Sequence, residues 1–310
     1  MRLLATFAAV VYLLASLAAT GCGGGANASE KKWLEEQTET TLAAVRSLGE
    51  LERSIREESA AGVQAGRYDQ ERLGSLIASA KVQAETILAG LAQSEAPTQR
   101  TNALVDLLRS GAQHYSRSLD GLRDAIAERY GSVRQAELTD EAAKEELRGQ
   151  RDLLAFSLKA LEIGEVELST DAEDALKFIE AYTRAEELDV EASTFDTSFM
   201  RELRAHDASI RSVTKAATAA RDAYTRYRVA LASLAKPLDD RLAAALADPL
   251  DAVDVIVESY ADLLRGIQAR SVPLVRAADE KRGEGFVALA EAPLKVQDAM
   301  RALALREESS

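Results

Sequence analysis

The sequence contains little of what builds disulfide-bonded, β-sheet or metal-binding proteins. Among its 310 residues are one cysteine, two histidines and five prolines, and aromatic residues make up 5%. A single cysteine excludes an intrachain disulfide, and two histidines leave few ligands for a transition-metal site. Sheets prefer β-branched and aromatic residues, whereas the abundant Ala and Leu favour helices. A helical protein stabilised by packing alone is therefore the expected class.

The balance of charge is strongly acidic. The chain has 51 acidic and 38 basic residues, which gives a formal net charge of −13. Nucleic acids are bound through Lys and Arg side chains that neutralise phosphates, so we expect no nucleic-acid partner. The same balance disfavours adhesion of the chain as a whole to anionic lipid.

The first 22 residues form a distinct segment, MRLLATFAAVVYLLASLAATGC. Arg2 precedes an apolar stretch, and small residues come directly before Cys22. This segment resembles the lipobox signal peptide of bacterial lipoproteins, with Ala19 at the position where that family most often has leucine. The resemblance implies a signal peptide over residues 1–21 and lipidation of Cys22, which becomes the N-terminus of the mature chain.

Residues 22–29 would then form the anchor and its tether. Two acyl chains on one cysteine give stable membrane attachment, and the glycine-rich stretch is flexible. The resemblance implies an exported protein, lipid-anchored to a bacterial membrane. Because Gly23 replaces Asp after the cysteine, it implies the outer membrane, facing the periplasm, in a Gram-negative organism. Two alternatives stay open: a cleaved secretory signal with a free thiol at Cys22, and an uncleaved apolar anchor.

Residues 30–310 show helical periodicity almost throughout, with no period-2 strand run. We predict an all-α fold, an elongated bundle of long antiparallel helices with coiled-coil-like packing. The loop-like stretch 188–195 is the predicted boundary between two halves. Predicted helices cover about 30–61, 68–93, 97–130, 140–164, 170–188 and 199–234, then a helix that begins at Asp248-Pro249 and a final region from Pro273 that is interrupted at 283–285.

The clearest repeat lies in residues 199–234. Alternating spacings of four and three are typical of a heptad seam, and they predict one helix of roughly 55 Å. Such a seam is covered within the chain or by a second copy, so self-association through it is a further prediction. Its positions are Phe199, Leu203, His206, Ile210, Val213, Ala217, Ala220, Tyr224, Tyr227, Leu231 and Leu234.

Four residues are candidate contacts for a ligand or a partner: His206, Tyr224, Tyr227 and Trp33. His206 is interpreted either as a ligand group or as the polar residue that sets the register of the seam. The tyrosine pair is surrounded by arginines in the sequence, which suits a contact surface, but its periodicity also suits seam packing. Trp33 follows the anchor closely and is expected at the membrane interface or against the first helix.

No catalytic motif accompanies these residues. The sequence lacks a P-loop, a dinucleotide-binding fingerprint, a Gly-x-Ser-x-Gly elbow and a His-Glu-x-x-His motif. The acidic residues along 248–262 are interpreted as a solvated helix face and not as a cation site. We therefore expect no enzymatic activity, no catalytic residue, no cofactor and no metal.

Two functions fit these observations. The leading hypothesis is a lipid-anchored helical protein that acts by binding an envelope protein, as a scaffold, spacer or assembly partner. The alternative is a ligand-binding or sensory helical bundle, which predicts an interhelical pocket with converging polar groups near His206 or the tyrosine pair. A membrane-remodelling helical protein ranks last, because no second apolar run follows the signal segment.

Overall fold

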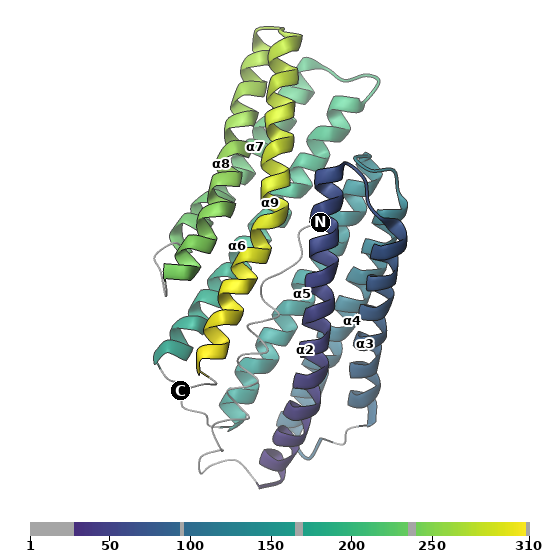
Figure 1. Cartoon of the computed structure of the whole chain (residues 1–310), viewed down its shortest axis with the longest axis vertical. Helices are drawn as coiled ribbons and strands as arrows, with labels where there is room; N and C mark the ends of the chain where they lie inside the picture. The colour runs from purple at the N-terminus through teal and green to yellow at the C-terminus, as the bar shows by residue number, and fades with distance from the viewer. Residues whose placement is uncertain (1–27, 94–95, 165–169, 235–239, 308–310) are drawn as a thin grey trace.

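The computed structural model describes residues 28–93, 96–164, 170–234 and 240–307 (Figure 1). Every regular element within these ranges is an α-helix, which confirms the all-α prediction. Along the chain the helices are α2 (Ala28–Ala65), α3 (Gln70–Gln93), α4 (Gln99–Ala127), α5 (Val133–Gly164), α6 (Thr170–Arg204), α7 (Ile210–Leu234), α8 (Asp240–Gln268) and α9 (Val272–Glu307).

The helices form two antiparallel four-helix units that lie side by side (Figure 1). In the first unit α2 to α5 pack in order along the chain, and α2 also packs on α5. The second unit consists of α6 to α9, and contacts of α5 with α6 and of α2 with α9 join the two. One cluster of buried apolar side chains extends through both units. The second unit projects beyond the first at the upper end of Figure 1.

The division between the units falls after α5 and not at residues 188–195. That stretch lies inside α6, where Val190 and Ala192 are buried. Its polar residues resemble a loop in the sequence, but the apolar residues between them pack against neighbouring helices. Tertiary packing therefore overrides the local composition that predicted a boundary.

Glycine ends α2 through a left-handed turn. Gly66 has a φ of 66°, a conformation that suits a residue without a Cβ. The N–H of Arg67 donates to the carbonyl of Gly62 at 3.0 Å, and the N–H of Gly66 donates to that of Val63 at 3.2 Å. This is the Schellman pattern of helix termination.

The predicted single helix over residues 199–234 is wrong. α6 ends at Arg204 and α7 begins at Ile210. Ser209 caps the start of α7. Its side chain accepts a hydrogen bond from the N–H of Ser212 at 3.0 Å, and its own N–H donates to the Ser212 hydroxyl. The seam is buried from Val213 onward, within α7, whereas Leu203 and Ile210 are exposed.

Two other helix starts differ clearly from the prediction. α5 begins at Val133 and not after Thr139, since the Ser132 hydroxyl accepts from a backbone N–H of the first turn. α8 begins before Pro249 and continues through it, and its buried stripe is Leu242, Leu246, Val253, Ile256, Tyr260 and Leu263.

α9 is continuous through the predicted interruption at 283–285. A Cβ on Gly285 would lie 2.7 Å from the Cγ1 of Ile256, so this glycine permits the close approach of α9 to α8. The sequence therefore signalled a helix contact here and not a helix end.

Within the described ranges no helix has both the length and the apolar character that crossing a bilayer requires. Cys22 and the signal segment predicted for residues 1–21 lie outside these ranges.

Candidate functional site

Two glutamates are buried in the core of the first unit. Glu52 in α2 and Glu146 in α5 are each 1% exposed. The nearest cation to Glu52 is Arg56, with Nη2 at 3.7 Å from its carboxylate. Neither carboxylate oxygen of Glu146 has a hydrogen-bond partner among the residues that the structure describes.

Burial shifts the acidity of both groups. It raises the pKa of Glu52 to about 7, although Arg56 and Tyr115 oppose the rise. Burial, reinforced by the charge of Glu52, raises the pKa of Glu146 well above its ordinary value. The arrangement can therefore hold protons in the core near neutral pH.

A buried ion pair ties the second unit together. Arg282 in α9 donates to the carboxylate of Asp196 in α6, and the hydroxyl of Tyr260 in α8 donates to the same oxygen. The guanidinium lies 5.3 Å from the ring centre of Phe199 and 5.5 Å from that of Phe286. Cation–π attraction thus adds to the ion pair. The cation bound at this site is therefore the guanidinium of Arg282 itself.

A pocket of about 200 Å³ lies where the two units meet. Asp140 of α5 lines it and accepts hydrogen bonds from the hydroxyls of Ser193 at 2.6 Å and Thr197 at 2.7 Å. Asp196 and Phe286 line it from the second unit. No lysine, arginine or histidine is among its lining residues, and of its two carboxylates Asp196 is already paired with Arg282.

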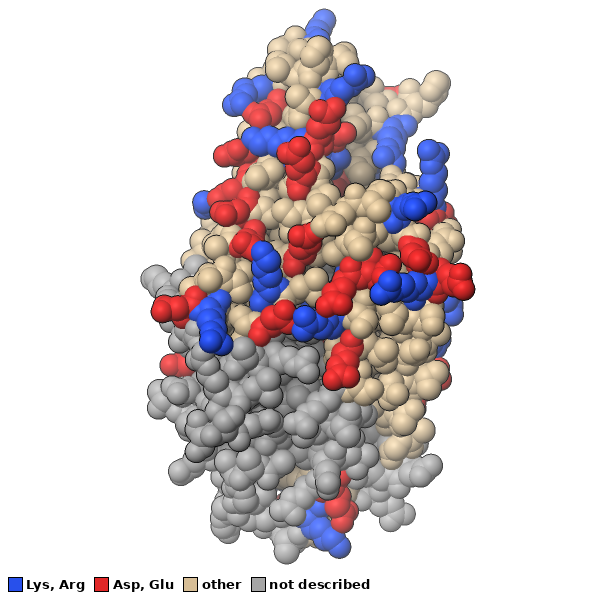
Figure 2. All heavy atoms as spheres, in the orientation of Figure 1, with Lys and Arg blue, Asp and Glu red and all other residues tan. Residues whose placement is uncertain are grey.

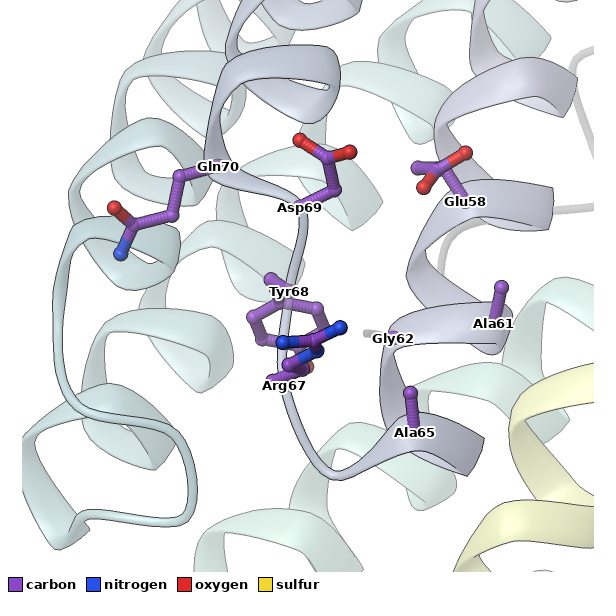
Figure 3. Close-up of a pocket in the computed structure, with 8 residues that line it drawn as sticks. All are labelled: Glu58, Ala61, Gly62, Ala65, Arg67, Tyr68, Asp69 and Gln70. Atoms are coloured by element: carbon purple, nitrogen blue, oxygen red, sulfur yellow. The ribbon is translucent and has the colours of Figure 1, made fainter.

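A larger hollow, of about 550 Å³, lies at the α2–α3 turn (Figure 3). Figure 3 shows Glu58 and Ala65 on the last turns of α2, with Arg67 to Gln70 on the segment that leads into α3. Arg72 of α3 already pairs with Glu58 at 2.8 Å. The hollow lies on the outer side of the turn between α2 and α3, and we assign no ligand to it.

Exposed large apolar side chains gather at one end of the molecule. Four of the six in the described residues lie in the helix turns that border the α6–α7 and α8–α9 connections. Both connections are in the upper part of Figure 1, whereas α2 begins at its lower end. The six are Val82, Leu203, Ile210, Val229, Val272 and Leu274.

The α6–α7 connection forms what we call the ledge, defined by exposed Leu203, His206 and Ile210. The last turn of α6 fixes it against the first unit. Arg201 donates to the carboxylate of Glu137 at 2.6 Å, and Arg204 donates to a carbonyl of the α4–α5 turn at 2.8 Å. Arg201 and Arg204 therefore hold the end of α6 against the first unit, while Asp207 and Arg211 are exposed beside the ledge.

The α8–α9 connection forms what we call the arginine tip, which comprises the exposed residues Arg265, Arg270, Val272, Pro273, Leu274 and Arg276. Residues 263–278 include three arginines and no acidic residue. Neither Arg270 nor Arg276 makes an ion pair with a described residue. In Figure 2, basic and uncharged side chains form the upper extremity, and acidic side chains begin below it.

Backbone geometry adds to the unusual character of this tip. Arg270 has a φ of 51°, the only positive φ at a non-glycine residue in the described ranges. Its N–H donates to Ile267 at 3.1 Å, and that of Ser271 donates to Gly266 at 2.9 Å, which is the same Schellman cap as at Gly66. An arginine thus occupies a position where glycine is strongly preferred.

The four candidate residues from the sequence are not brought together. His206 is exposed on the ledge, whereas Tyr224, Tyr227 and Trp33 are buried. Tyr224 packs against Phe286, with ring centres 5.8 Å apart. Packing therefore accounts for both tyrosines and for the tryptophan.

The acidic face of α8 is largely engaged in ion pairs to its neighbours. Asp254 pairs with Arg228 of α7, and Glu258 pairs with Lys281 of α9. The described residues include no group of three or more His, Cys, Asp or Glu side chains arranged to hold a metal ion.

Sequence reasoning missed the buried charges. The signal was present, since Leu48, Glu52 and Ile55 follow one another at spacings of four and three, which places the glutamate on the apolar stripe. Asp196, three residues before Phe199, and Arg282, four residues before Phe286, share this property. Charged residues in phase with an apolar stripe were the available indication.

Comparison with protein-family models, with curated proteins and with solved structures gives no match to this chain.

Proposed function

We propose that the protein is lipid-anchored outside the cytoplasm and acts by protein interaction, in a scaffold, spacer or assembly role in the cell envelope. The observation that carries the proposal is the ledge, an apolar surface at the end of the molecule opposite the start of α2. Exposed apolar groups gathered at one place mark interaction surfaces. The proposal includes no enzymatic activity and no nucleic-acid partner.

The ledge suits a protein partner because Leu203 and Ile210 expose apolar area there. Arg201 and Arg204 are already engaged with the first unit. The centres of protein interfaces are poor in charge and rich in apolar contacts. A rigid surface also loses little conformational entropy when it is covered.

The anchor part of the proposal rests on Cys22 and the segment before it. The lipobox resemblance supports acylation of Cys22 and, in a Gram-negative organism, attachment to the outer membrane facing the periplasm. The same proposal includes coiled-coil-like packing of the α7 seam against its neighbours. Such packing of long helices gives an elongated body, which would hold the ledge away from the anchoring membrane.

A photo-crosslinking amino acid at Ile210 tests the partner. The matched control is Val82 on α3, because both side chains are 59% exposed. In native membranes we expect a defined protein adduct from position 210 that is absent from position 82. Leu203→Ser should weaken that adduct without unfolding the chain, since Leu203 is exposed. Identical adducts at the two positions would contradict the proposal.

A second copy of the chain is one partner that the ledge could take. The α7 part of the seam is buried within the chain, which leaves Leu203, His206 and Ile210 as its exposed members. Self-association through residues 199–234 therefore predicts an Ile210 adduct of twice the chain mass. Mass spectrometry of that adduct separates self-association from an envelope partner.

The anchor has its own test. Cys22→Ser should yield an unprocessed, unlipidated precursor, read out by the mass of the N-terminal peptide. Unchanged processing and membrane retention in the variant would refute the anchor while leaving the ledge result intact.

A ligand-binding role is the second candidate, and the pocket between the units favours it. Its lining carboxylate Asp140 would attract a small organic cation, whereas Asp196 and the ring of Phe286 are already engaged by Arg282. Ala143→Leu should fill the pocket. If alkylammonium ions raise the melting temperature of the native chain and not of this variant, the ligand-binding role gains support.

A further inference from the structure

We infer that the arginine tip is a docking site for an anionic phospholipid surface, which gives the molecule a membrane contact at the end opposite the start of α2. The inference depends neither on Cys22 nor on the ledge. Its elements are a local excess of arginine, an exposed apolar cap and a strained arginine at the turn.

The charge of the tip opposes that of the whole chain. Residues 263–278 carry a net charge of +3, from three arginines and no acidic residue, in a chain of net charge −13. Arg265 also pairs with Asp262, but Arg270 and Arg276 have no ion-pair partner among the described residues. Guanidinium groups without internal partners are suited to bind phosphate oxygens.

The apolar side chains of the tip form a cap and not a stripe. Val272, Pro273 and Leu274 are consecutive and all exposed. Successive residues of a helix point about 100° apart, so these three surround the end of α9 and do not mark one face. A fluid lipid interface can enclose such a protruding end, with the apolar groups below the phosphates and the arginines at their level.

A protein partner is the less favoured occupant. A stable protein interface buries about 800 Å² on each side, which requires a broad surface. The end of one helical hairpin presents three apolar residues in divergent directions. The ledge differs in this respect, because Arg201 attaches it to α5 and Arg204 attaches it to the α4–α5 turn.

Local folding does not explain why an arginine occupies the left-handed position 270. The equivalent turn after α2 uses Gly66 at the same position, and the α4–α5 turn has Gly131 with a φ of 71°. Glycine would satisfy the same cap after α8 without strain. Retaining a strained residue at an exposed turn is typical of sites where that side chain has a function.

The test places an environment-sensitive fluorophore at the tip. The full chain carries Cys22→Ser and Leu274→Cys, so that the label has one position, and a second chain carries Val82→Cys as the control. The probes are vesicles of phosphatidylcholine alone and vesicles that also contain phosphatidylglycerol. We expect a blue shift at position 274 with the anionic vesicles only, and none at position 82. The shift should weaken with salt.

Two substitutions show whether the arginines cause the effect. Arg270→Gly and Arg276→Gln should each lower the apparent partition onto anionic vesicles roughly fivefold. Arg270→Gly removes strain, so a loss of binding in this variant cannot come from unfolding. Arg100→Gln, an exposed arginine on α4, is the matched control and should change nothing.

Three results would overturn the inference. One is the absence of any difference at position 274 between neutral and anionic vesicles. Another is an equal shift at position 82, which would mean that the body as a whole adheres. The third is an equal shift with soluble polyglutamate, which would assign the tip to an acidic protein. All of these chains carry Cys22→Ser and therefore lack the lipid anchor. The result is thus independent of whether the lipid-anchor proposal is correct.

Discussion

Gly66 and Arg270 occupy the same left-handed position at the ends of two helices, with φ values of 66° and 51°. Both turns have the hydrogen bonds of a Schellman cap. Only the side chain differs, so the chain offers an internal comparison of glycine and arginine in one backbone conformation.

Arg270→Gly should therefore stabilise the protein. A non-glycine residue in the left-handed region costs about 1 kcal/mol, and the substitution removes that strain. The free energy of unfolding, measured in urea, should rise by about this amount, while Gly66→Ala should lower it by about as much. Equal effects of the same sign would show that the two turns are not equivalent.

Close contact between α4 and α5 depends on two glycines. A Cβ on Gly111 would lie 3.1 Å from the carbonyl oxygen of Gly149, and one on Gly149 would lie 3.0 Å from that of Gly111. Either Gly→Ala substitution should push the helices apart and lower the free energy of unfolding by about 1–3 kcal/mol. Gly74→Ala on α3 is the control, because nothing lies within 4 Å of its Cβ, and it should stabilise by roughly 0.5–1 kcal/mol.

The buried pair Asp196–Arg282 should be costly to break. Arg282→Met leaves the carboxylate of Asp196 in the core with Tyr260 as its remaining partner in the cluster, and we expect a loss of about 3 kcal/mol or more. Adding Asp196→Asn should recover part of that loss, because it removes the stranded charge. Arg109→Met, at a partly exposed pair with Asp106, should change stability by about 0.5 kcal/mol or less. Additive losses in the double variant would contradict the coupling.

The buried glutamates predict a pH dependence. The pKa of Glu52 is about 7 in the folded chain against 4.5 ordinarily, so the folded state keeps a proton that the unfolded state has lost. Stability from this group is complete below pH 4.5 and falls as pH rises to about 7, by on the order of 3 kcal/mol. The raised pKa of Glu146 acts in the same direction.

Glu146→Gln isolates this effect, since glutamine resembles the protonated acid. Its unfolding free energy should match that of the native chain near pH 5 and exceed it at pH 8. Glu85→Gln, on the exposed side of α3, is the control. A native chain that is more stable at pH 8 than at pH 5, with no change in Glu146→Gln, would rule out buried protonation.

Apolar periodicity predicted the helices well where one buried face repeats without interruption. α7 follows its predicted stripe from Val213 onward, and in α3 the regularly spaced Leu73, Ile77, Ala80 and Ala84 are buried. In α8, Ile256 and Leu263 are buried together with Val253 and Tyr260, whereas Val257 and Leu264 are only partly buried. A helix with apolar residues around much of its circumference allows more than one stripe, and only its neighbours select between them.

The ledge and the arginine tip could not be found from the sequence. Leu203 and Ile210 continue a perfect heptad pattern, yet they are exposed because the helix stops between them. Recognising the Ser209–Ser212 capping box would have indicated the stop. The α6–α7 and α8–α9 turns lie at one end of the molecule because of the order in which the helices pack.

The sequence alone determined the helical class, the absence of a disulfide and the resemblance of residues 1–22 to a lipoprotein signal, because these depend on composition and local pattern. Tertiary structure decided where the units divide, which charges are buried and which apolar residues remain outside. These follow from contacts between residues far apart in the chain, such as Asp196 with Arg282. Local periodicity determines which face of each helix is apolar. The whole fold decides which neighbouring helix that face packs against.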